Sequence, residues 1–493
     1  MRILNRALLV SAFGGSAMLM AACPASLDDE CAKNACVAAS TSSGGEGGID
    51  SGPDAPPIDP CATPTNPPDP KCLDDSTTLF VSPTGSDTNP GTKAAPLQTV
   101  NAAVNAATND KKRVYVCEGT YAENVKIGKT LAIIGGINCA WNAKGTRAKI
   151  IPAKGIAVTI TKAATVSITE LSIAASADSQ VKSDSAIAVF VSESQSVLIR
   201  SSDVTAGPGV DGANGANGDD TPNYVGATAI GGNTTGDGTG APAPTCGTCA
   251  DATFSAGGKG APVSGSPDPG SADPAVGGNN AGGTTGGVCS GGTQGARGLA
   301  PAAAAVGAQA PGSASADGWQ SALTAAKGGN GKPGQGGGGG GWESPLGGGS
   351  GGCGGCGGTA GGPGGNGGSS FAVLAFKAEL VVEDSTLTAA KAGAGGSGGK
   401  GQDGQFRGNN GGGACPGGLG GHGAGGGGGG GGAGGHSAAI AHVGARPVAT
   451  RSTLKPGEAG GVGGGGGAGN GPGNPGPAGN AGGVGLAKDF LPL

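Results

Sequence analysis

Charged residues at predicted strand positions are the first candidates for chemistry in this chain. Acid and base cleavage of a sugar chain uses clustered Asp or Glu on one strand face, with Arg, Lys or calcium to stabilise the developing charge. Arg200 with Asp203, or Asp384 near Arg451, could form such an exposed cluster. The full set on predicted strands is Glu170, Arg200, Asp203, Glu383, Asp384 and Arg451. Charges on the outside of stacked strands more often form a solvated ladder, so we expect no catalytic residue among them.

Two Cys-x-x-Cys motifs suggest a second kind of chemistry, metal binding. Cys246 with Cys249 and Cys353 with Cys356 have the spacing of a zinc knuckle. The motifs lie far apart in glycine-rich loops, however, so we expect disulfides, either between the motifs or with Cys289 and Cys415. We therefore expect no metal site, and nothing else in the sequence indicates a cofactor.

The N-terminal residues predict export from the cytoplasm. Arg2 and Arg6 precede the apolar run 7–20, which is too short to span a bilayer and is typical of an export signal. The sequence Met20-Ala-Ala-Cys23 resembles a bacterial lipobox, where a signal peptidase cuts before a diacylated cysteine; cleavage at a nearby Ala-x-Ala-like site is the alternative. We expect a signal peptide at 1–22, a lipid on Cys23, and a location in the bacterial cell envelope, at the outer membrane or cell surface.

A short pattern recurs between stretches of glycine and predicts a repeated structural unit. Its copies are 197–204, 380–387 and 448–454, and each runs directly into a glycine-rich segment. With 113 Gly and 33 Pro among 493 residues, and 3% aromatic residues, only the apolar islands can form a core. We expect stacked coils with inserts on one face. The predicted parts are a tether at 23–78, coils at 79–205, 370–389 and 436–456, inserts at 206–369 and 390–435, and a glycine-rich tail at 457–493.

The segment 79–135 contains several motifs together. Residues 80–92 read Phe-Val-Ser-Pro-Thr-Gly-Ser-Asp-Thr-Asn-Pro-Gly-Thr, an amphipathic helix with Leu97, Val100 and Val104 on one face follows, and Gly119-Thr-Tyr-Ala-Glu123 comes next. This order resembles the N-terminal cap and first coils of right-handed parallel β-helix proteins of the pectate-lyase-like superfamily. The resemblance implies an all-β solenoid with an N-terminal capping helix. The superfamily includes polysaccharide lyases, galacturonidases and pectin esterases.

The cysteine count agrees with an oxidising compartment, because 13 cysteines less Cys23 leave an even 12. Cys117 and Cys139 are separated by about one turn of such a solenoid, so we favour a disulfide between them; two buried thiols are the alternative. The disulfide candidates are Cys31, Cys36, Cys61, Cys72, Cys117, Cys139, Cys246, Cys249, Cys353 and Cys356.

Glycine often falls at every third position within the loops. Examples are Gly209, Gly212, Gly215 and Gly218, then Gly395 to Gly404, and Gly473 to Gly485. This period matches the polyproline II type of helix, and the segments resemble polyglycine-II assemblies. Collagen is a competing interpretation, but phase slips and few Gly-Pro-x triplets argue against a long triple helix. Disorder is the remaining alternative.

These features favour a non-catalytic surface lipoprotein with a structural or adhesive role, which displays glycine-rich loops on a β-helix. A net charge of −5 without a basic stripe excludes nucleic acid as a natural partner. We expect the membrane, through the lipid anchor, and an envelope polysaccharide or another cell surface as partners. The alternative is a carbohydrate-active enzyme, of lyase or hydrolase type, that acts on an acidic polysaccharide.

Overall fold

The structure is a computed structural model that describes residues 61, 68–219, 229–249, 252–273, 290–322 and 325–493. Within these ranges the protein is predominantly β, in agreement with the all-β class expected from the sequence. Most of the strands belong to three parallel sheets, here named A, B and C. Cys23, Cys31, Cys36 and Cys289 lie outside the described residues, as does the predicted signal peptide.

The chain runs through sheets A, B and C in turn and then begins again at sheet A. We call each run through the three sheets a passage. Sheet A contains β1 (Thr78–Val81), β2 (Arg113–Cys117), β5 (Leu131–Ile137), β8 (Val166–Thr169), β11 (Val197–Arg200), β18 (Leu380–Glu383) and β21 (Val448–Thr450). Sheet B contains β3 (Thr120–Tyr121), β6 (Ala148–Ile150), β9 (Leu171–Ala175), β12 (Asp203–Ala206), β19 (Thr386–Ala389) and β22 (Thr453–Lys455). Sheet C contains β4 (Val125–Ile127), β7 (Val158–Thr161), β10 (Ala186–Ser192), β17 (Ser370–Phe376), β20 (Ser437–Val443) and β23 (Ala487–Pro492).

Equivalent side chains of successive passages stack in columns and form the core. In sheet A, Val197 of β11 pairs in register with Val166 on one side and with Leu380 on the other. All three side chains are buried, and alternate residues along each strand face inward as the strand period of two requires. The parallel register therefore repeats one apolar layer along the stack.

A single residue with positive φ turns the chain from sheet A to sheet B. Glu170, Ser201, Asp384 and Arg451 occupy this corner in successive passages, with φ between 47° and 53°. A serine follows in the later passages, and its hydroxyl accepts a hydrogen bond from the passage before: Ser202 N–H donates to Ser385 Oγ (3.1 Å), and Ser385 N–H to Ser452 Oγ (3.2 Å). The recurring sequence pattern is therefore the signature of this corner.

A short helix, α1 (Val100–Ala106), covers the first passage as the sequence predicts. The Thr99 hydroxyl caps it by accepting from the Ala102 amide, and the Glu123 carboxylate accepts from the Val100 amide at 2.7 Å. Val100 and Val104 of the predicted apolar face are buried on the helix. Leu97 is buried too, but it lies before the helix, in a β-bridge with Val81. Before β1, the 3₁₀ helix η1 (Pro70–Leu73) packs against the domain and is tied to Cys61 by a disulfide from Cys72. The end of the predicted 23–78 tether is therefore folded, because buried Leu73 and this disulfide hold it.

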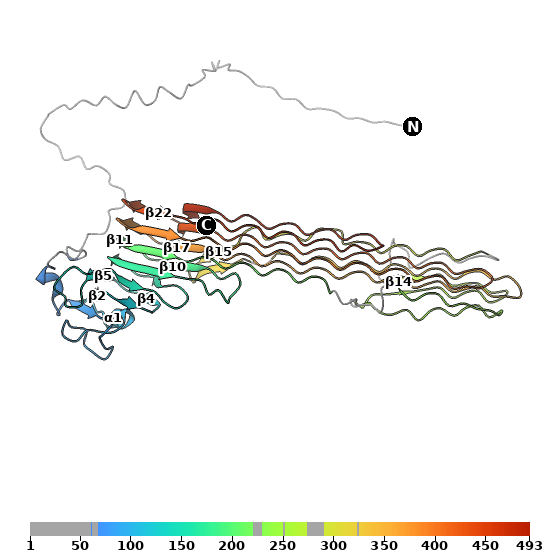
Figure 1. Cartoon of the computed structure of the whole chain (residues 1–493), viewed down its shortest axis with the longest axis horizontal. Helices are drawn as coiled ribbons and strands as arrows, with labels where there is room; N and C mark the ends of the chain where they lie inside the picture. The colour runs from blue at the N-terminus through green and yellow to red at the C-terminus, as the bar shows by residue number, and fades with distance from the viewer. Residues whose placement is uncertain (1–60, 62–67, 220–228, 250–251, 274–289, 323–324) are drawn as a thin grey trace, which may run out of the picture. The chain divides into compact units, whose positions relative to one another are not determined.

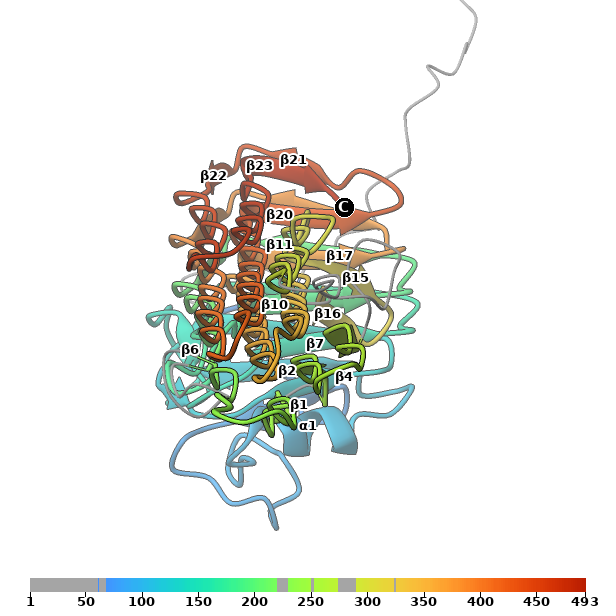
Figure 2. The same ribbon diagram turned by 90° about the vertical axis from the view of Figure 1, so that its right-hand side faces the viewer.

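All long inserts leave the stack at one corner, between sheet B and sheet C. The chain leaves β12 and returns at β17, leaves β19 and returns at β20, and leaves β22 and returns at β23. In Figure 1 these segments run side by side away from the sheets, and Figure 2 looks along them. The predicted tail at 457–493 thus ends in a strand, because Ala487–Pro492 pairs with β20.

A hairpin from the first insert covers the outer face of sheet C. Its strands are β15 (Gly312–Ser315) and β16 (Gly318–Ser321), and Trp319 packs edge-on against Phe371 of β17 at 5.0 Å between ring centroids. A second hairpin pairs β13 (Phe254–Ala256) with β14 (Ser271–Asp273) within the same insert. Sheet C is therefore buried on both faces next to the point where the glycine segments leave it.

Candidate functional site

The charged residues that the sequence offers for acid and base chemistry lie at the turn from sheet A to sheet B, here named the charged corner. Glu170 is nearly buried and receives Arg147, whose Nε lies 3.3 Å from Glu170 Oε2, and Lys144, whose Nζ lies 3.6 Å from Oε1. Arg147 also pairs with Asp203. The two carboxylates therefore share one guanidinium instead of facing each other across an empty site.

The remaining candidates pair across successive passages. Arg200 pairs with Glu383, with Nε 2.9 Å from Oε2, and not with Asp203 as one of the predicted clusters required. Parallel register explains this difference, since it places Arg200 directly beside Glu383. Arg451 makes a two-pronged contact with Asp384 at 2.7 and 2.9 Å, and this hydrogen bonding lowers the pKa of Asp384. The arrangement is a ladder of ion pairs in which each acid already has a cation.

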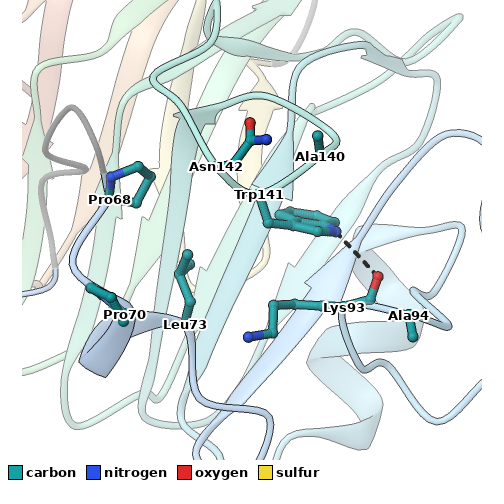
Figure 3. A pocket seen from close by; sticks show the side chains of 8 residues that line it. All are labelled: Pro68, Pro70, Leu73, Lys93, Ala94, Ala140, Trp141 and Asn142. Atoms are coloured by element: carbon teal, nitrogen blue, oxygen red, sulfur yellow. Dashed lines mark hydrogen bonds between the residues drawn. The ribbon is translucent and has the colours of Figure 1, made fainter.

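An open depression lies beside the N-terminal cap (Figure 3). Trp141 lines it together with Leu73 and Asn142, and the indole Nε1 donates to the Lys93 carbonyl at 3.3 Å. Trp141 has φ 59°, which is unusual for a large residue, and its ring packs edge-on against Phe80. The lining includes no carboxylate and no histidine. We interpret Trp141 as the residue that holds the η1 segment in place.

The glycine-rich segments form the largest organised feature outside the sheets. They are extended and hydrogen-bond to one another at every third residue. The amides of Gly209, Gly212, Gly215 and Gly218 donate to the carbonyls of Lys391, Ala394, Ser397 and Lys400, in that order, at 2.7–3.0 Å. This is the period of an extended helix with three residues per turn, which has no hydrogen bonds of its own and must bond to neighbours. We name the whole assembly the bundle.

One segment, 416–435, lies in the centre of the bundle and has neighbours on all sides. Its backbone bonds to segments 291–309, 326–341, 347–369, 391–413, 457–470 and 473–485. Consecutive residues face different neighbours: a Cβ on Gly428, Gly429 or Gly430 would lie 2.1, 1.9 or 2.2 Å from the carbonyl oxygen of Gly466, Gly362 or Val306, respectively. No side chain fits at those distances. The unbroken glycine run 425–432 is therefore the sequence of a fully surrounded segment.

A segment at the edge of the bundle needs glycine at only one position in three. In segment 207–218 the third position of each triplet carries Asp211, Asn214 or Asn217. Their Oδ1 atoms accept from the amides of Ala394, Ser397 and Lys400 at 2.7–2.9 Å. Each of these pairs is separated by 183 residues, as are Ser202 and Ser385 in the corner. The bundle thus continues the register of the stacked strands.

Disulfides fasten the bundle and the first passages. Cys246 bonds to Cys353 and Cys249 to Cys356, both with a sequence separation of 107. The Cys-x-x-Cys spacing is one turn of the three-residue helix, so two such motifs side by side match pair by pair. Cys117 and Cys139, the pair favoured from the sequence, form a disulfide with a Cα–Cα distance of 4.9 Å.

Cys415 is buried with a free thiol. Within the described residues, no group of three or more possible ligands could hold a metal.

Two histidines, His436 and His442, lie where the bundle meets sheet C. His436 is buried, and its Nδ1 accepts from the Leu486 amide at 3.0 Å, just before β23. Burial lowers the pKa of His436 and of His442. His442 Nδ1 is buried without a hydrogen-bond partner. Neither imidazole is placed to exchange a proton with a carboxylate of the charged corner.

No protein-family model matches this chain, and no curated protein resembles it significantly. Among the described residues, no helix has the length and apolar character needed to cross a bilayer. The residues and their geometry therefore carry the functional argument alone.

Proposed function

We propose that the protein is a non-catalytic, lipid-anchored protein of the bacterial cell surface, which holds a rigid glycine bundle outward in a structural or adhesive role. In this proposal the three sheets form a right-handed parallel β-helix, the usual hand of parallel crossovers, and the bundle is a polyglycine-II assembly. Lipid on Cys23 would attach it to the membrane. The observation that supports the proposal best is that paired residues in the sheets and in the bundle have the same separation of 183 residues, so the bundle extends directly from the stacked strands.

Rigidity is the physical basis of this role. The central segment and the segments that surround it are held to one another by backbone bonds at every third residue, and two disulfides lock a peripheral segment to segment 347–369. At about 3.1 Å per residue, the central segment is roughly 60 Å long. Flexible loops of equal length would lose more conformational entropy when they bind a partner. A stiff projection presents many weak contacts at fixed spacing, and these add through multivalency.

The charged corner argues for a supporting role. All the acids there pair with arginine, so the ladder stabilises stacking between passages. The alternative, a carbohydrate-active enzyme on acidic polysaccharide, needs a carboxylate free to give or take a proton. Release of reducing ends from an acidic polysaccharide by the purified full chain tests this alternative.

A surface-labelling experiment tests the proposal. An epitope inserted at Ser344, in the exposed turn 343–346 of the bundle, should bind antibody on intact cells that express the full chain, and labelling should not rise on permeabilisation. The Cys23→Ser variant should release the protein from the cells. Labelling only after permeabilisation would contradict surface display. Release of reducing ends from acidic polysaccharide by purified full chain would contradict the non-catalytic role.

A further inference from the structure

Within the part of the chain that the structure describes, two neighbours of the central segment end part-way along it. Segments 457–470 and 473–485 lie above the central segment, between segments 391–413 and 291–309. They are joined by a turn, where the Gly404 amide donates to the Asn470 carbonyl and the Asn474 side chain donates to the Gly298 carbonyl. Beyond this turn the central segment continues, but nothing among the described segments continues above it.

On one face of the central segment, the residues change from glycine to larger residues at the point where the two upper segments end. Gly425, Gly428, Gly431 and Gly434 face the two upper segments, and a Cβ there would lie 2.0–2.1 Å from the carbonyl oxygens of Gly469, Gly466, Gly463 and Gly460. The same face, continued in steps of three beyond the turn, carries His422, Leu419 and Pro416. Side chains therefore replace glycine where the neighbouring backbone ends. We name this stretch of three side chains the ledge; Pro416 is exposed, and Leu419 and His422 are half-buried.

His422 takes the hydrogen-bonding role of the missing neighbour. Along segment 391–413, amides at every third residue donate to segment 457–470, and the last is Gly404. The next amide in this series, that of Arg407, donates to His422 Nδ1 at 3.1 Å. The ledge is thus a finished surface with a satisfied backbone. A further glycine segment does not fit there, since the imidazole occupies its place.

Aromatic and basic side chains border the ledge. The Phe406 ring meets His422 edge-on at 5.7 Å between centroids and is 52% exposed. Arg407 lies on that side, and Arg297 lies on the other, beside Gly298, whose amide donates to the His422 carbonyl at 2.8 Å. Burial, and then the charges of Arg407 and Arg297, lower the pKa of His422. Within the described residues neither arginine forms an ion pair.

We propose that the ledge binds a carboxylate-bearing polysaccharide, laid along the bundle from the turn outward. Two guanidinium groups without acid partners suit carboxylates, which they can bind through two parallel hydrogen bonds. An exposed phenylalanine ring offers an apolar face to a sugar ring. The proposal deepens the display function above by naming its partner class, and it rests on that function for its biological setting.

The test is calorimetric titration of the purified full chain with hexagalacturonate, a linear oligomer of uronic acid. Maltohexaose, a neutral hexasaccharide, and hexaglutamate, an anionic peptide, are the comparison ligands. The variant R297Q/R407Q should bind hexagalacturonate at least tenfold more weakly, and F406A should weaken it severalfold. The matched control R446Q/K488Q removes two positive charges from the last strand passages and should change the affinity less than twofold.

Three results would overturn the proposal: unchanged hexagalacturonate affinity in R297Q/R407Q, equal affinity of the wild type for maltohexaose, or equal affinity for hexaglutamate. Far-ultraviolet circular dichroism and an unchanged melting temperature show that each variant folds. The outcomes separate the two proposals. Surface labelling with no effect of R297Q/R407Q would leave display standing and reject the ledge. Arginine-dependent binding without surface labelling would do the reverse.

Discussion

Two glycine substitutions in the bundle should have opposite effects on stability. In the centre, a Cβ on Gly429 would lie 1.9 Å from the Gly362 carbonyl oxygen, so the two backbones must separate by more than 1 Å. That movement breaks the bond from Gly429 N–H to the Gly399 carbonyl (2.9 Å) and the bond that Gly466 N–H donates to Gly429 (2.8 Å). Two lost bonds with buried groups left unpaired amount to about 3–6 kcal/mol for Gly429→Ala.

At the upper surface, Gly461 has no atom within 4 Å of an added Cβ. Gly461→Ala should therefore stabilise the bundle by about 0.4–1 kcal/mol, because it restricts the unfolded chain without a clash. Hydrogen exchange of peptides from segment 457–470 and from the central segment measures the opening free energy of each variant. The reasoning is refuted if Gly429→Ala protects the bundle as well as Gly461→Ala does.

Three further outcomes follow from the described contacts. Glu383→Gln should lower the unfolding free energy by about 3–5 kcal/mol, since Arg200 is left mostly buried without its partner. Asp384→Asn, at the exposed pair with Arg451, should cost much less, and equal losses in chemical denaturation would contradict the ladder. Reduction of the disulfides should expose the peripheral segments to protease before the central segment. Uniform digestion would contradict the role of the two disulfides in holding the peripheral segment. Burial lowers the pKa of His436 below its usual 6.5, so the contribution of the neutral imidazole to stability is complete above that pH and is lost as the pH falls. The melting temperature of the wild type should therefore drop more between about pH 7.5 and about pH 5 than that of His436→Asn, whose side chain can still accept from the Leu486 amide. Equal drops would refute this.

The strands and their corner were predictable from the sequence because both leave local signatures. Alternation of apolar residues shows inward-facing positions, and the repeated segment before each glycine stretch marks the turn from sheet A to sheet B. The Cys117–Cys139 bond follows from the length of one passage. The partner of Arg200 was not predictable in the same way. It depends on which passage stacks on which across an insert, and the separation of 183 residues is set by the length of that insert.

Other features were missed although a signal was present. The hairpin over sheet C turns at Ala316-Asp317, and Gly318 and Trp319 open its second strand; an Asp-Gly pair of this kind is a hairpin indication inside a glycine-rich insert. The last strand carries Phe490 and Leu491, apolar residues that stand out from the tail. The Cys-x-x-Cys motifs match the three-residue period of the surrounding glycine. Composition alone hides such signals, because a glycine-rich average masks the few residues that decide local structure.

The most direct test of the account is amide hydrogen exchange over the glycine run 425–432 in the full chain. The structure places these amides in bonds to neighbouring segments on several sides, so the account predicts protection comparable to that of the buried strand β10. Exchange at the intrinsic rate of an unstructured chain would contradict it. In that case the inserts would be flexible, and the rigid bundle, the ledge and the proposed display role would all lose their foundation.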